Sequence, residues 1–86
     1  MNAETEKKIG ENIKKFRLNA KMTQDVLAAK MQLSGCDITR SAIAKIEVGQ
    51  RHIYPDEIII LKEILNVSFD DIENFGGVTL SLAFLF

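Results

Sequence analysis

Apolar side chains repeat every three to four positions along most of this 86-residue chain, and this spacing restricts the fold more than any other feature. In an α-helix such positions share one face, so each repeat can bury one side of a helix against a core. The first repeat consists of Ile9, Ile13, Phe16 and Ala20, with Lys and Glu between them. It predicts a helix over Thr5–Asn19 whose apolar face points inward.

Helix-start and helix-stop residues predict a second helix after this one. Thr23 is a good N-cap, and Gly35 can end the helix in a left-handed conformation. The side chains expected to face inward are Val26, Leu27, Ala28, Met31 and Leu33.

A third helix is predicted over Thr39–Val48. Asp37 or Thr39 can cap it, and Gly49 is expected to end it with a positive φ. The inward side chains are expected to be Ile43 and Ile46.

Two more helices complete the predicted domain. Pro55 suits a first helical position, so the fourth helix is placed at Pro55–Leu65. The fifth is placed at Asp70–Phe75 and is stopped by Gly76 and Gly77. The buried residues of the fourth helix are expected to be Ile58, Leu61, Ile64 and Leu65. The expected fold is therefore all-α, a compact five-helix domain within residues 1–77.

Residues 78–86 form an apolar C-terminal tail with a different pattern. Apolar residues alternate from Val78 to Phe86, and a period of two predicts a strand. The five-helix domain offers this strand no partner, so pairing with a second copy of the chain would satisfy it.

The charge is divided unevenly between the two parts of the chain. Residues 1–54 carry a net charge of +4 and residues 55–86 carry −5, which leaves −1 in total. The division suggests one cationic face, although chance variation among solvated helices would also produce it. The single cysteine, Cys36, excludes an intramolecular disulfide and fits a cytoplasmic protein. We see neither a signal peptide nor a membrane-spanning run, and we expect no metal, no cofactor and no enzymatic activity.

The span from Thr23 to Gly49 resembles the phage-repressor and Cro-like helix-turn-helix family, of the xenobiotic-response-element type. The matching residues are Thr23-Gln24, Leu27-Ala28 and the run Ser41-Ala42-Ile43-Ala44-Lys45-Ile46-Glu47-Val48-Gly49. The resemblance extends over residues 9 to 75. It implies a lambda-repressor-like fold that binds double-stranded DNA, with Thr39–Val48 as the recognition helix in the major groove.

The resemblance also implies which residues contact DNA. The base contacts it implies are Arg40, Ser41, Ala44 and Lys45, although Lys45 could bind phosphate instead. The backbone contacts are Arg17, Thr23, Gln24, Thr39, Arg51 and His52. Arg17 is further expected to pair with Glu47 and so to orient the recognition helix.

One departure from the family lies between the second and third helices. Gln32–Asp37 replaces a single glycine, so the turn is longer by about five residues. We expect this loop to expose Cys36, as a passive thiol rather than a redox switch.

These features favour a transcriptional regulator, a repressor that binds as a homodimer. The dimer contact would use Val78–Phe86 or the fourth and fifth helices. The alternative is an antitoxin that binds both its operator and a toxin protein, which a pull-down recovering a toxin would support.

Overall fold

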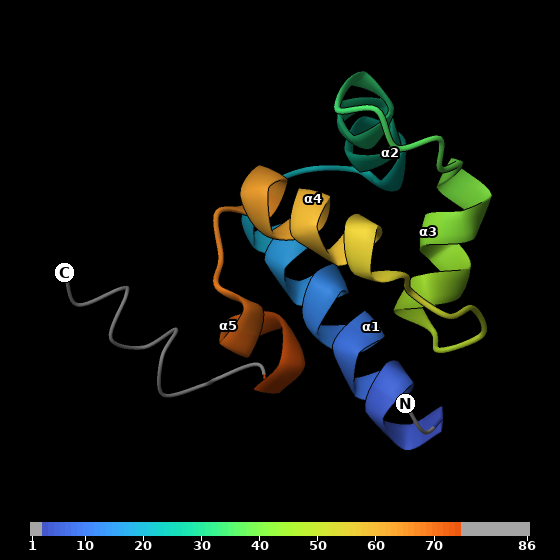
Figure 1. Ribbon diagram of the computed structural model, residues 1–86, viewed down its shortest axis with the longest axis vertical. Coiled ribbons are helices and arrows are strands. Elements are labelled where there is room, and N and C mark those ends of the chain that lie inside the picture. Colours follow the sequence, from blue (N-terminus) through green and yellow to red (C-terminus); the bar gives the residue numbers. More distant parts are fainter. Residues whose placement is uncertain (1–2, 75–86) are drawn as a thin grey trace, which may run out of the picture.

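The computed structural model describes residues 3–74, and all the regular structure in that range is helical (Figure 1). The all-α, five-helix prediction is confirmed, and the predicted helix boundaries lie within two residues of the observed ones. No helix in residues 3–74 is long and apolar enough to cross a membrane. The strand predicted for Val78–Phe86 lies outside the described residues. The helices are α1 (Ala3–Asn19), α2 (Gln24–Leu33), α3 (Arg40–Glu47), α4 (Pro55–Leu65) and α5 (Phe69–Asn74).

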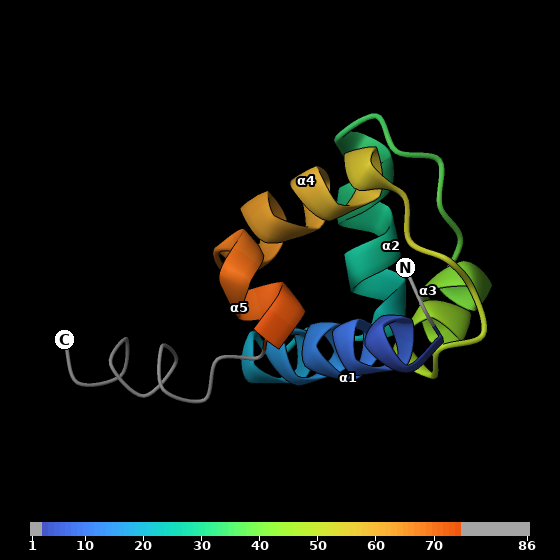
Figure 2. The same cartoon turned by 60° about the horizontal axis from the view of Figure 1, so that its bottom comes forward.

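Helix α1 is the base on which the other elements assemble. It packs most extensively against α5 and α3, while α2 packs against α3 and α4 (Figure 2). The helices enclose one apolar core to which all five contribute. Its fully buried members are Ile13, Leu27, Met31, Ile38, Ile43, Leu61 and Ile72. This arrangement fixes α3 between α1 and α2 and leaves its remaining side open.

The first four helices all end in the same local structure. A residue with positive φ follows each helix, and the next N–H bonds back to a carbonyl of the last turn, which is a Schellman motif. The positive-φ residues are Lys21, Gly35, Gly49 and Asn66. The left-handed conformation predicted at Gly35 and Gly49 is confirmed, whereas that of Lys21 and Asn66 was not predicted.

Some inward positions were predicted wrongly. Leu33 is 88 % exposed, and Val26 and Ala20 are also exposed. Leu27, Ala28 and Met31 form the buried stripe of α2, and at 3.6 residues per turn Val26 and Leu33 lie on the opposite side. Apolar character alone did not reveal how narrow the buried face of this ten-residue helix is.

The expectation that the long turn exposes Cys36 is also wrong, because Cys36 is buried. The Schellman motif explains this placement. The Cys36 N–H bonds to the Met31 carbonyl at 2.9 Å, and the residue at this position normally packs back against the end of its own helix. Gln32 closes the turn by donating from Nε2 to the Ile38 carbonyl at 2.7 Å. The extra residues therefore form an ordered turn that joins the core.

Candidate nucleic-acid interface

Helix α3 is held by its cap and by two buried isoleucines. Thr39 Oγ1 accepts a hydrogen bond from the Ala42 N–H at 3.1 Å, which satisfies one free N–H of the first turn. Ile43 and Ile46 are buried in the core. Together these contacts fix the rotation of α3 about its own axis, and therefore which residues it presents outward.

Gly10 allows α1 to approach α3 closely. A Cβ at this position would lie 2.0 Å from the Ile46 carbonyl oxygen, so no larger residue fits without movement of α3. Gly10 was not among the residues predicted from the sequence to matter for packing. The sequence did contain a sign of this role. A glycine inside a helix lowers helix stability by about 1 kcal/mol relative to alanine, so its presence there indicates a packing requirement.

The structure brings Arg17 and Glu47 together in a buried ion pair. Arg17 Nε lies 2.7 Å from Glu47 Oε2, and Arg17 Nη2 lies 3.0 Å from Glu47 Oε1. The two side chains are 7 % and 1 % exposed. Arg17 Nη1 also donates to the Met22 carbonyl at 2.8 Å, so this one guanidinium joins α1, the α1–α2 turn and α3. Such a fork-to-fork pair fixes both position and orientation.

Gln24 extends the ion pair to the start of α2. Its Nε2 donates to Glu47 Oε1 at 3.0 Å, so the Glu47 carboxylate binds side chains from both α1 and α2. The preceding Thr23 caps α2, and its Oγ1 accepts from the Val26 N–H at 3.1 Å. The N-terminus of α2 is thereby tied to the end of α3.

The residues predicted to read bases lie on the outward side of α3. Arg40, Ser41 and Lys45 are exposed, and Ala44 between them is half-buried. Arg40 is 3.7 Å (Nε to Oδ1) from Asp25 in the first turn of α2. Polar and basic side chains of a single short helix therefore share one open face, opposite its buried isoleucines.

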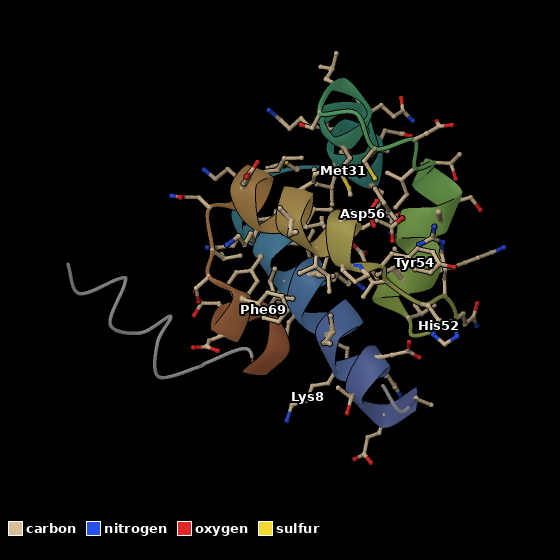
Figure 3. All side chains as sticks on the ribbon, viewed as in Figure 1. Lys8, Met31, His52, Tyr54, Asp56 and Phe69 are labelled. Atoms are coloured by element: carbon tan, nitrogen blue, oxygen red, sulfur yellow. The ribbon has the colours of Figure 1, made fainter. Side chains whose placement is uncertain are left out.

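Arg51 and His52 lie in the loop between α3 and α4, and each contacts a carboxylate of this chain. Figure 3 shows His52 and Tyr54 in this part of the molecule. Arg51 forms two hydrogen bonds to Glu57, at 3.0 and 3.1 Å, and lies over the ring of Tyr54. The hydrogen bond to Glu57 raises the pKa of the Arg51 guanidinium. His52 Nδ1 contacts Glu6 Oε1 of α1. The loop is thus anchored to both α1 and α4.

Sequence reasoning missed several buried polar groups that hold the frame. Glu57 accepts the Tyr54 N–H at 2.9 Å in addition to binding Arg51. Asn12 Nδ2 donates to the Ile72 carbonyl at 2.8 Å and so joins α1 to α5 across 60 residues. An apolar pattern gives no signal for such pairs. The sequence did offer one sign of a buried polar group: Asn12 is polar and lies beside Ile13 in the apolar repeat of the first helix.

The thiol of Cys36, in the turn between α2 and α3, has a raised pKa. Burial raises the pKa of its thiol, and the nearby carboxylates of Glu57 and Asp56 raise it further, against a smaller opposing effect of Arg51. A thiol of this kind stays protonated and is a poor nucleophile. Within residues 3–74, no group of three His, Cys, Asp or Glu side chains is placed to hold a metal ion.

Helices α2 and α3 are both capped and follow one another, and α3 presents a polar face outward while the buried Arg17–Glu47 pair holds its end. This arrangement defines a helix-turn-helix DNA-binding domain. The chain matches the helix-turn-helix family over residues 13–72, and it belongs to this family, of the Cro/C1 type. No curated protein and no solved structure gives a significant match to it. The family is one of DNA-binding transcriptional regulators, so the chain is a DNA-binding protein of the regulator type.

Proposed function

We propose that this protein is a sequence-specific repressor that places α3 in the major groove of double-stranded DNA. The observation that carries the proposal is the division of α3 into a buried side and an exposed side bearing Arg40, Ser41 and Lys45. A major groove about 12 Å wide admits one helix. Arginine and lysine can donate to guanine O6 and N7, and the Ala44 methyl group can contact a thymine methyl.

The starts of α2 and α3 supply the phosphate contacts in this proposal. The Thr23 and Thr39 oxygens accept capping hydrogen bonds, and each hydroxyl keeps its own proton to donate to a phosphate oxygen. Gln24 gives one Nε2 hydrogen to Glu47, which leaves the second for phosphate. The free N–H groups and the partial positive charge of a helix N-terminus favour the same anion.

Arg17, Arg51 and His52 take a supporting part in binding. Arg17 is buried, and we propose that it acts by holding Glu47 and, through Glu47, Gln24. Arg51 and His52 are anchored by Glu57 and Glu6, so the loop after the recognition helix is held in a fixed place. Phosphate contacts from that loop would add affinity without sequence preference.

A dimer acting in the cytoplasm completes the proposal. One domain makes few base contacts, and two domains on half-sites about one helical turn apart would raise both affinity and specificity. Ile59 of α4 and Phe69 of α5 are each about half exposed, which supports a contact through these helices. The apolar sequence Val78–Phe86 supports a contact through the tail. A repressor of this kind would act by occupying its operator.

Selection of duplexes from a random library at a fixed salt concentration tests the proposal. We expect one enriched sequence with two-fold symmetry, bound at least a hundredfold more tightly than a shuffled duplex. Arg40→Ala should weaken binding to the enriched duplex much more than to the shuffled one, whereas Gln24→Ala should weaken both together. Equal losses on both duplexes for Arg40→Ala would contradict the role given to Arg40, and the absence of any enriched sequence would contradict specific binding.

A further inference from the structure

The N-termini of α2 and α3 bring one acidic and one basic side chain together on the open face. Asp25 is the second residue of α2, and Arg40 is the first of α3. Asp25 Oδ1 lies 3.7 Å from Arg40 Nε, and the side chains are 77 % and 61 % exposed. Neither side chain contributes to the core. Asp25 in the first turn favours the N-terminus of α2, but a carboxylate on a face that meets phosphates also opposes DNA binding.

We propose that Asp25 is a specificity-determining residue that positions the Arg40 guanidinium for base reading. This inference rests on the proposed function. An arginine side chain has several rotatable bonds, and a bidentate contact with guanine O6 and N7 requires one orientation of its plane. The Asp25 carboxylate attracts the guanidinium at its Nε, 3.7 Å away, and both Nη groups can donate to the base.

The exposure of the pair determines when it acts. In the free protein water screens the pair, and its contribution to folding stability is small. DNA bound on this face would exclude water and strengthen the attraction between the two groups. The same carboxylate would repel phosphates at every site where Arg40 has no guanine to bind. Asp25 therefore favours the operator in two ways, by orienting Arg40 and by weakening non-specific binding.

Asp25→Asn tests this inference, because it removes the charge and keeps the shape. Asp70→Asn is the matched control: Asp70 is also exposed and is the second residue of its helix, α5. Binding of each full-length variant would be measured by fluorescence anisotropy on the selected duplex and on its shuffled version, at three salt concentrations. The informative quantity is the ratio of the two affinities. Thermal unfolding monitors the fold of each variant.

We expect Asp25→Asn to tighten binding to the shuffled duplex by about threefold, because one repulsion from the phosphates is lost. The affinity ratio should fall by about tenfold, within the range that one bidentate contact supplies. Asp70→Asn should leave the ratio unchanged. In the Arg40→Ala background, Asp25→Asn should produce no further fall in the ratio, because the residue that it positions is gone.

Two results would overturn the inference. One is an unchanged affinity ratio for Asp25→Asn in a protein that otherwise prefers the selected duplex. The other is an equal fall of the ratio with and without Arg40, which would mean that Asp25 acts independently of Arg40. A wild-type protein without any preference for the selected duplex would instead contradict the proposed function itself.

Discussion

Gly10 of α1 lies so close to Ile46 of α3 that a Cβ at position 10 would be 2.0 Å from the Ile46 carbonyl oxygen. The contact is with backbone rather than with a flexible side chain, so it cannot be relieved by a rotamer change. The separation of α1 from the recognition helix is thus set by the missing side chain of a single residue.

Gly10→Ala should therefore destabilise the domain by about 2 kcal/mol, because the steric overlap outweighs the helix propensity gained. Urea unfolding followed by circular dichroism measures this change. The neighbouring Glu11 is exposed on the same helix, and Glu11→Ala should change the stability by less than about 0.5 kcal/mol. A Gly10→Ala variant as stable as the wild type would show that α1 and α3 can separate freely.

Removing one partner of the Arg17–Glu47 pair should be far more damaging than replacing both. Glu47→Ala leaves a buried guanidinium without its carboxylate, and a loss of about 3–5 kcal/mol is expected. The double variant Arg17→Met, Glu47→Leu removes both charges and should recover a large part of that loss. The same unfolding measurement distinguishes the two variants. A double variant less stable than Glu47→Ala alone would contradict this account.

The buried thiol of Cys36 should make stability decrease at alkaline pH. Its folded pKa lies above the ordinary value of 9.0, so the folded state holds the proton more tightly than the unfolded state. Stability is then full below pH 9 and falls as pH rises through the raised folded pKa, by at most about 1.4 kcal/mol per pH unit. Cys36→Ala removes this group alone. The stability difference between wild type and Cys36→Ala, followed from pH 7 to 10.5, should change in favour of the variant above pH 9.

Deletion of Val78–Phe86 should lower the oligomeric state if the tail joins two copies of the chain. Light scattering of the full chain and of residues 1–77 measures the molar mass directly. Phe69→Ser in the full chain tests the contact through α5 separately, because Phe69 is half exposed. The same molar mass for all three proteins would reject both dimer contacts.

The local chemistry of helix ends made most of the fold predictable. Thr23 and Thr39 cap the helices that they were expected to cap, and Gly35 and Gly49 have the positive φ expected of them. These signals act over three or four residues, so they can be read from the sequence alone. Lys21 escaped prediction because a lysine seldom adopts this conformation, so its residue type gives no sign of it.

Contacts between distant residues were much harder to predict. The bond of Asn12 to Ile72 depends on how whole helices pack, and no local pattern encodes it. The pairing of Arg17 with Glu47 was predicted only because the sequence resembles a known family. The prediction that Leu33 of α2 is buried failed for a related reason. Leu33 is apolar, and only the packing of residues 3–74 shows that its side chain is exposed.

The two sides of α3 also bear on how this protein can change over time. Ile43, Ile46 and Glu47 are committed to the interior, whereas Arg40, Ser41 and Lys45 make no contribution to the core. Substitutions on the exposed side can accumulate with little loss of stability. A lineage, or a protein engineer, can therefore redirect this domain to new operators by exchanging a few outward side chains on an unchanged frame.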